Sequence, residues 1–147
     1  MHLKRLKREL YQFRMLSHKF YNVWQVDEND IENLIGAIAG PTGSPYEGGI
    51  FFVKITIPNI FPLKSPSITF LTKIYHINIC ESTGAVSPDC DLWFPFVTLT
   101  EMMENLLALL REPDLDCIAN QISYDRYTRN IERYEETAKE WTQLYAI

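Results

Sequence analysis

The spacing of apolar residues changes twice along the chain, and this change constrains the fold more than any other feature. Residues 2–15 carry leucines and a phenylalanine at helical spacing, with basic side chains on the other faces. Residues 20–71 are rich in aromatic and β-branched types, which alternate with polar residues most clearly over 50–57. Helical spacing returns from residue 98 onward. This order predicts an α+β fold in which the helices are segregated from an antiparallel sheet.

Four short apolar runs are predicted as strands, and they are 20–26, 34–39, 50–57 and 68–71. Polar and Gly-Pro turns separate them at short intervals, which predicts an antiparallel meander. Residues 72–97 show no clear period, and a long irregular stretch in a compact domain is often functional. Thr98-x-x-Glu101 is a capping-box pattern that predicts the start of a helix. A short helix around 116–123 and a last helix from about Thr128 are expected after it.

The chain length and the start of the chain restrict the class of protein. With 147 residues we expect one domain spanning 1–147. No apolar run reaches the roughly 18 residues that a membrane span needs, and the basic start lacks the apolar stretch of a secretion signal. A protein of the cytoplasm, the nucleus or both, without a membrane partner, is therefore expected. The 3 cysteines are an odd count, and together with the missing signal they favour reduced thiols over disulfides.

The charge is unevenly distributed along the chain. The formal net charge is −5, yet residues 1–19 are strongly basic and residues 81–147 are acidic. A solvated or protein-binding basic helix explains this pattern better than nucleic-acid binding, which we do not expect.

Five segments, in this order and spacing, make the chain recognisable. They are the opening Leu3-Lys4-Arg5, the turn-rich stretch 40–52, Tyr75-His76-Ile77-Asn78-Ile79, Trp93-x-Pro95 and the ending 139–146. Together they resemble the ubiquitin-conjugating enzymes, and the two terminal segments resemble the D subfamily most. The resemblance implies the ubiquitin-conjugating fold over the whole chain, with an N-terminal helix, a four-stranded meander, a long active-site loop and C-terminal helices.

The catalytic position of that family is changed here. In the family a cysteine thiolate accepts the C-terminus of ubiquitin as a thioester, which a substrate lysine then attacks. The matching window runs from Gly84 to Asp89 and holds Ser87 at the nucleophile position. A serine hydroxyl is a weak nucleophile without an adjacent base, whereas a thiol with a pKa near 8.5 gives usable thiolate. The resemblance therefore points to a catalytically impaired site.

The resemblance also assigns roles to neighbouring residues. His76 corresponds to a structural histidine, and Ile77 replaces the family's proline after it. Asn78 corresponds to an asparagine that stabilises the oxyanion or orders the loop, and both roles stay open. Asp116 belongs, with Asp114, to the acidic gate that helps to deprotonate the incoming lysine.

Three other chemistries for this region have weaker support in the sequence. His76 and Asp89 are a conceivable base and orienting residue for a serine hydrolase built on Ser87. Cys90 or Cys80 is a conceivable replacement nucleophile. Cys80, Cys90, His76 and Cys117 are potential zinc ligands, but no C-x-x-C pair supports a site. No metal and no cofactor are expected.

Binding surfaces resemble the family more than the catalytic position does. The ligase-binding positions implied by the resemblance are Lys4, Arg5, Pro62, Leu63, Phe94, Pro95 and Phe96. Expected partners are ubiquitin, a ubiquitin ligase of RING or HECT type, and the ubiquitin-activating enzyme or an active conjugating enzyme. On the back of the sheet, which binds ubiquitin non-covalently in the D subfamily, Val23 is expected in place of a serine.

Three functions remain open on the sequence. The first is a catalytically impaired variant that binds ubiquitin, a ligase or an active conjugating enzyme. The second is a true conjugating enzyme, in which Ser87 is engineered or slow or in which Cys90 is used. The third is a folded chain with little function. Whether the chain is an enzyme is therefore undecided, and Ser87 favours the inactive form.

Overall fold

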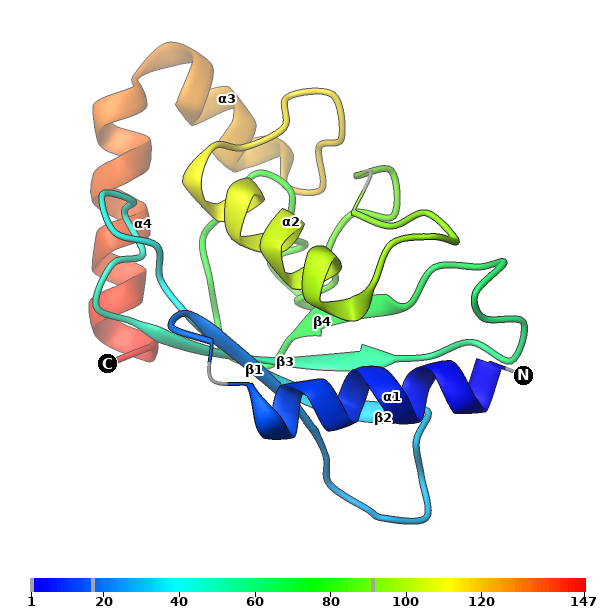
Figure 1. Cartoon of the computed structure of the whole chain (residues 1–147). Coiled ribbons are helices and arrows are strands. Elements are labelled where there is room, and N and C mark those ends of the chain that lie inside the picture. Colours follow the sequence, from blue (N-terminus) through cyan, green and yellow to red (C-terminus); the bar gives the residue numbers. More distant parts are fainter. Residues whose placement is uncertain (1, 17, 91) are drawn as a thin grey trace.

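The computed structural model describes residues 2–16, 18–90 and 92–147. The elements in chain order are α1 (His2–Met15), β1 (Tyr21–Gln25), β2 (Asn33–Ala39), β3 (Ile50–Thr56), β4 (Ser67–Phe70), α2 (Leu99–Arg111), α3 (Gln121–Arg129) and α4 (Ile131–Tyr145). One helix, four strands and then three helices along the described chain confirm the predicted α+β architecture (Figure 1).

The strands form one sheet in the order β1-β2-β3-β4, with each neighbouring pair antiparallel. Val23 lies opposite Gly36, Gly36 opposite Val53, and Val53 opposite Phe70, so these positions cross the sheet in one row. Side chains alternate between a buried and a more exposed face along each strand. The predicted meander is therefore confirmed, and only one face of the sheet contributes to the core.

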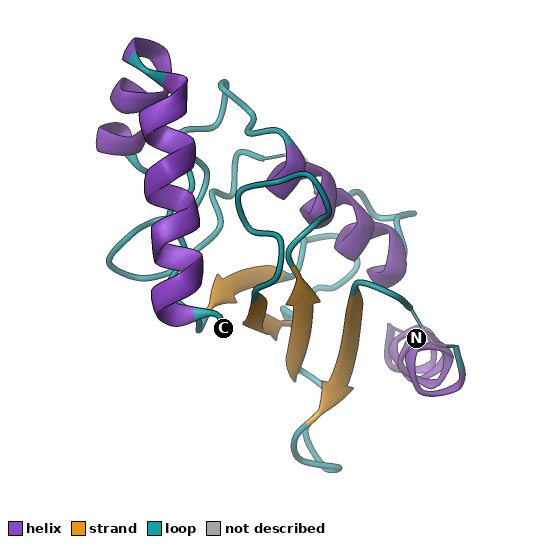
Figure 2. Ribbon diagram, turned by 90° about the vertical axis from the view of Figure 1, so that its left-hand side faces the viewer, coloured by secondary structure: helices purple, strands orange, loops and turns teal. Residues whose placement is uncertain are grey.

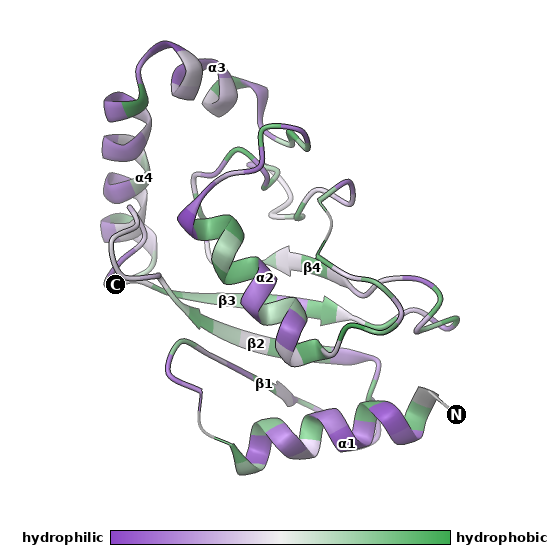
Figure 3. Cartoon of the chain, turned by 45° about the horizontal axis from the view of Figure 1, so that its top comes forward, coloured by the Kyte–Doolittle hydropathy of each residue, from purple (hydrophilic) through white to green (hydrophobic). Residues whose placement is uncertain are grey.

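The core lies between this buried face and the helices. The helix α2 crosses above the sheet, α1 lies beside the β1 edge and α4 stands at the opposite end (Figures 1 and 2). The ribbon of β2, β3 and part of α2 is hydrophobic in Figure 3, as expected for elements that enclose a core. Leu6 of α1, Ile55 of β3 and Met103 of α2 are fully buried there.

Two helix boundaries differ from the sequence prediction. The helix expected around 116–123 begins only at Gln121, where Asn120 caps it by accepting a hydrogen bond from the Ser123 amide. The last helix begins at Ile131 rather than near Thr128, because Asn130 ends α3 and also caps α4. The capping pattern at Thr98 is confirmed, since its hydroxyl accepts a hydrogen bond from the Glu101 amide.

The prediction for Val23 is wrong. Its side chain is 3% exposed and belongs to the core, whereas its neighbours Asn22 and Trp24 face outward. Successive strand residues point to opposite faces, so a shift of one residue in alignment moves a side chain from one face to the other. The back of the sheet therefore presents Asn22 and Trp24.

Within the residues that the structure describes, no helix combines the length and the apolar character needed to cross a membrane.

Candidate active site

The segment that carries Ser87 is fastened to the edge of the sheet. Gly84 has a φ of +79°, and a Cβ at this residue would lie 2.1 Å from the Phe70 carbonyl oxygen. The same glycine accepts a 2.7 Å hydrogen bond from the Phe70 amide through its carbonyl. Any side chain at position 84 would prevent this contact, so the glycine sets the path of the chain toward Ser87.

Ser87 is held by the backbone but has no catalytic partner. Its amide donates to the Asn78 carbonyl at 2.9 Å, and its side chain is buried enough to leave the residue 7% exposed. The one hydrogen bond found for its Oγ comes from the Asp89 amide, at 3.4 Å. In the described part of the chain, no histidine or carboxylate accepts the proton of this hydroxyl, so the hydroxyl lacks a general base.

Both ring nitrogens of His76 form hydrogen bonds with backbone groups. Its Nδ1 accepts a 3.0 Å hydrogen bond from the Asn78 amide, so Nε2 carries the proton and donates to the Leu109 carbonyl at 2.8 Å. The residue is fully buried, and burial lowers the pKa of the imidazole to about 4. Both nitrogens are occupied away from Ser87, so a serine-hydrolase arrangement with His76 as base is not formed.

Asn78 joins the active-site loop to the segment between α2 and α3. Its side-chain Nδ2 donates to the carbonyls of Asp114 and Cys117, each at 2.7 Å, and its Oδ1 accepts from the Asp114 amide at 3.0 Å. The residue is fully buried. Because the amide has two donors and both are used, this geometry favours loop ordering over oxyanion stabilisation.

The two acidic residues of the predicted gate lie on this same segment. Asp114 accepts a 2.9 Å hydrogen bond from the Asp116 amide through its carboxylate. Asp116 is exposed, as a residue that meets an incoming lysine must be. The structure thus brings Asn78, Asp114 and Asp116 together.

The prediction of reduced thiols is wrong for two of the cysteines. Cys90 and Cys117 form a disulfide, with their Cα atoms 5.4 Å apart and a separation of 27 positions in the sequence. Both side chains are buried. The turn after Ser87 and the segment after Asp114 both pack around Asn78, which brings these distant positions together. While the bridge is closed, Cys90 carries no thiolate and cannot replace the missing nucleophile.

The four potential zinc ligands are not assembled. Among the described residues, the one group with metal-ligand spacing is Cys90, Asp114 and Cys117, which excludes His76 and Cys80. Its two sulfurs are bonded to each other, and zinc binds thiolates rather than a disulfide. Cys80 is the free cysteine, and hydrogen bonds from Ser82 and Thr83 lower the pKa of its thiol to about 7.

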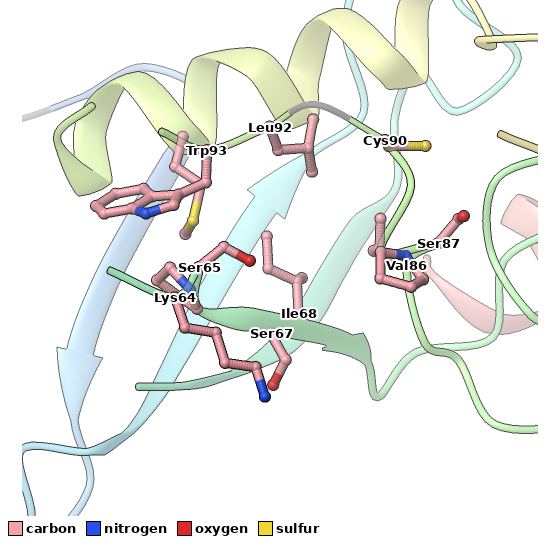
Figure 4. Close-up of a pocket in the computed structure, with 12 residues that line it drawn as sticks. Lys64, Ser65, Ser67, Ile68, Val86, Ser87, Cys90, Leu92 and Trp93 are labelled. Carbon is pink, nitrogen blue, oxygen red and sulfur yellow. The ribbon is translucent and has the colours of Figure 1, made fainter. Parts of the chain in front are cut away.

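A cavity of about 200 Å³ lies beside Ser87. Its wall includes Val86, Ile68 and Leu92, with Trp93 at one end and Ser87 at the other (Figure 4). Figure 4 also shows the Cys90 sulfur pointing away from the Trp93 end. Cys80 lines a different cavity, bounded by Phe70 and Gly84, so it does not share the space beside Ser87.

Arg5 connects α1 to the loop that precedes α2. Its guanidinium donates to the carbonyls of Pro95 and Val97 at 2.6 and 2.5 Å. It also lies 5.2 Å from the ring centroids of both Phe61 and Trp93. Arg5 therefore contacts the loop that carries Pro95 and also the ring of Phe61, which precedes Pro62.

The other predicted ligase-binding residues are mostly exposed. Leu63 and Phe96 are 82% and 81% exposed, and Phe94 stacks on Phe96 with ring centroids 5.9 Å apart. Lys4 and Pro95 are also exposed, whereas Pro62 is half-buried after a cis peptide bond to Phe61. We call Leu63, Phe94 and Phe96 the apolar face. Exposed apolar side chains that are grouped in this way are typical of interaction surfaces.

Two structural features had no signal in the sequence. The first is the bridge between Cys90 and Cys117, because no local pattern links the two positions. The second is Glu9, which is 6% exposed and whose carboxylate accepts both from Arg5 and from the amide of Leu99 at the start of α2. Its place in a helical, charged stretch predicts only a solvated side chain.

The fold and this site can now be compared with known proteins. The family model described as "Ubiquitin-conjugating enzyme" matches residues 5–142. The chain is 37% identical over 146 residues to "Ubiquitin-conjugating enzyme E2 K" of Homo sapiens, covering 98% of this chain and 72% of that protein. It is 36% identical over 145 residues to "Ubiquitin-conjugating enzyme E2 1" of Schizosaccharomyces pombe, covering 97% of this chain and 66% of that protein.

Solved structures agree with this result. A Toxoplasma gondii ubiquitin conjugating enzyme domain superposes with a TM-score of 0.86 at 32% identity, covering 100% of both chains. A chain from Plasmodium yoelii assigned to the same enzyme class gives a TM-score of 0.88 at 34% identity, covering 98% of this chain and 94% of that one. The protein belongs to the ubiquitin-conjugating enzyme family. Membership of this family implies, in general terms, ubiquitin, activating enzymes and ligases as partners.

Proposed function

We propose that this chain is a catalytically impaired member of the family that works by binding. The observation that carries the proposal is the environment of Ser87, whose hydroxyl meets a backbone amide and, among the described residues, no base. Transfer of ubiquitin requires a nucleophile that is deprotonated at neutral pH, and an unassisted serine hydroxyl does not meet that condition.

The surrounding residues support the same proposal. The Asn78 amide donates to the gate carbonyls and not toward Ser87. Loss of one oxyanion donor typically lowers a rate by about 10²–10³. The weak nucleophile at position 87 and the direction of the Asn78 donors are separate defects. A sulfur atom at position 87 would restore the nucleophile but would not turn the Asn78 donors toward it.

The binding side of the proposal rests on the Arg5 contacts and on the apolar face. The arginine fixes the loop before α2 against α1, which presents Phe94 and Phe96 to solvent. We propose a ubiquitin ligase of RING or HECT type as the partner on this face. Ubiquitin itself, the activating enzyme or an active conjugating enzyme are further partners of the same pathway.

Three finer assignments belong to this proposal. The opening residues 3–5 and the ending 139–146 support a placement closest to the D subfamily. Residues 1–147 form a single ubiquitin-conjugating domain. The protein acts in the cytoplasm, the nucleus or both.

A charging assay tests the catalytic part. The protein is incubated with ubiquitin-activating enzyme, ubiquitin and ATP, and the products are separated on a non-reducing gel. We expect no adduct. An adduct that resists thiol reductant but is cleaved by mild base would place an oxyester on Ser87. An adduct lost in reductant would place a thioester on a cysteine. Either adduct would overturn the proposal that the protein is catalytically impaired.

The variant Ser87→Cys tests how far the site has changed, in a Cys80→Ser background that removes the free thiol. We expect this variant to accept ubiquitin but to discharge it to free lysine about 10²–10³ times more slowly than an active conjugating enzyme, since Asn78 is committed elsewhere. Discharge at the rate of the active enzyme would contradict a wider loss of catalytic function.

A pulldown with RING- and HECT-type ligase domains tests the binding part. Phe96→Asp should weaken capture at least about tenfold, because a charge at an exposed aromatic anchor opposes burial. Ile122→Asp is the matched control, since Ile122 is 69% exposed but lies on α3. Failure of every ligase domain to bind the unchanged protein, or equal losses in both variants, would refute docking on the apolar face.

A further inference from the structure

We propose that the bond between Cys90 and Cys117 is a reversible redox clasp, which fastens the turn after Ser87 to the gate segment and is opened by a small thiol. The clasp does not depend on whether Ser87 has any activity. It concerns the position of a loop rather than the chemistry of the serine.

The bridge joins two segments whose other attachments differ. On one side, the gate segment is held to the 76–79 segment by hydrogen bonds from the amides of Ala119 and Asn120 to the Ile77 carbonyl, at 2.8 and 2.9 Å. The Asn78 side chain adds three more contacts to the same segment. None of these contacts involves a sulfur–sulfur bond, so the gate segment keeps its position when the disulfide is reduced.

In the described part of the turn after Ser87, we find no second attachment to the gate segment. The Cys90 amide donates to the Ser87 carbonyl and the Leu92 amide to the Cys90 carbonyl, and both bonds are internal to the turn. Among the described residues, the tie from this turn to the gate is the disulfide itself, together with the long contact from the Cys90 sulfur to the Cys117 carbonyl at 3.8 Å. Reduction therefore removes the link between the turn and the gate segment, while the Asn105 side chain of α2 still donates to the Leu92 carbonyl at 3.1 Å.

The bridge belongs to the buried core, since Cys90 and Cys117 are both members of its cluster. A chain of 147 residues nevertheless does not need a staple to fold. The bond joins the turn after Ser87 to the gate segment, so its redox state bears on the position of residues next to Ser87.

A reductant can reach the bridge through a cavity. Cys90 shares the wall of a space of about 390 Å³ with Asn105, Glu112 and Asp114. This space is large enough for a small molecule and has polar walls. A thiolate that enters it attacks one bridge sulfur, and the other sulfur leaves as a thiolate and takes up a proton. A second thiol then displaces the first, so the bridge gains two electrons and two protons while the two thiols are oxidised to their disulfide.

The direct test counts thiols in the folded, full-length protein. Samples are equilibrated in buffers with different ratios of glutathione to glutathione disulfide, alkylated and weighed by mass spectrometry. We expect one alkylated thiol, Cys80, in oxidising buffers and three in reducing buffers, because the 3 cysteines divide into one free thiol and one pair. The two additional thiols should appear together, with a dependence on the square of the glutathione concentration.

Hydrogen exchange tests the structural consequence. After reduction, the amides of Asp89 and Cys90 in the turn should exchange at least about tenfold faster, whereas amides of 112–120 should change by less than about twofold. The double variant Cys90→Ser/Cys117→Ser should match the reduced protein in every buffer, and Cys80→Ser should respond like the unchanged chain.

Three results would overturn the proposal. Three alkylated thiols at every ratio would mean that the bridge does not form. One alkylated thiol at every ratio would mean a permanent staple. Equal acceleration in both segments would mean that the bond does not act on the turn. If the double variant fails to fold, the reduced natural chain still separates these outcomes.

Discussion

Asn78 shows how one side chain can define the catalytic region. Its amide makes three hydrogen bonds to the gate segment and is fully buried. Truncation would leave buried backbone groups of Asp114 and Cys117 without partners, which is more costly than losing the bonds alone.

We predict that Asn78→Ala lowers the free energy of unfolding by about 2–4 kcal/mol, as measured by urea denaturation. The matched control is Asn33→Ala, because the Asn33 side chain bonds to Asp30 at the surface and its loss should cost less than about 0.5 kcal/mol. Similar effects of the two substitutions would argue against a structural role for Asn78.

His76 makes the stability depend on pH. Burial holds its pKa in the folded protein near 4, below the ordinary value of 6.5, so between these values the unfolded chain binds more protons. The contribution of the neutral ring is therefore complete above about pH 6.5 and is lost as the pH falls toward 4.

We predict that the free energy of unfolding falls by about 2 kcal/mol between pH 7 and pH 5, and that urea titrations at both values detect it. The half-buried His18 provides a control, since His18→Gln should leave this difference in place. An equal stability at both pH values would show that the histidine is not kept neutral by burial.

At the scale of elements, the sequence predicted what local spacing determines. All four strands and the first helix follow from the apolar period, and the start of α2 follows from the capping pattern at Thr98. The start of α3 was misplaced because residues 116–120 are held in the gate segment by tertiary bonds to Ile77, which override helix formation. Val23 was assigned to the wrong face because one residue of register reverses the sides of a strand.

The candidate site was only partly predictable for a related reason. The resemblance located Ser87, Asn78 and Asp116, and the structure places Ser87 and the gate segment around Asn78. The pairing of Cys90 with Cys117 depends on two loops meeting in space, and a separation of 27 residues carries no local signal. The direction of the Asn78 donors likewise depends on carbonyls that are supplied by a distant segment.

Arg5 offers a test of how α1 is joined to the rest of the fold. We predict that Arg5→Ala lowers the free energy of unfolding by about 1–3 kcal/mol, because it removes charged hydrogen bonds to Pro95 and Val97 and the contact with two rings. The neighbouring Lys4→Ala should change it by less than about 0.5 kcal/mol, since Lys4 is exposed. Thermal unfolding of both variants gives the comparison, and equal values would contradict a joining role for Arg5.

At the scale of the whole molecule, the disulfide should stabilise the folded state by restricting the unfolded chain. Closing a loop of this length is worth about 3–4 kcal/mol on the chain-entropy model. For a protein of 147 residues this corresponds to roughly 10 °C in Tm.

We therefore predict that a thiol reductant lowers the Tm of the natural chain by about this amount in calorimetry. The Cys80→Ser variant should show the same decrease, and Cys90→Ser/Cys117→Ser should show none on adding reductant. A decrease of equal size in the double variant would assign the effect to something other than the bridge.

The contacts of Glu9 have a consequence for how the molecule comes apart. Its carboxylate lies at the first turn of α2, accepting from the Leu99 amide, and holds Arg5 on its own helix at 2.8 Å. Detachment of α1 would remove an anion from the positive end of α2 and also release the Arg5 anchor on the preceding loop. The helices α1 and α2 therefore belong to one cooperative unit. Local opening of α1 is coupled to fraying of the first turn of α2.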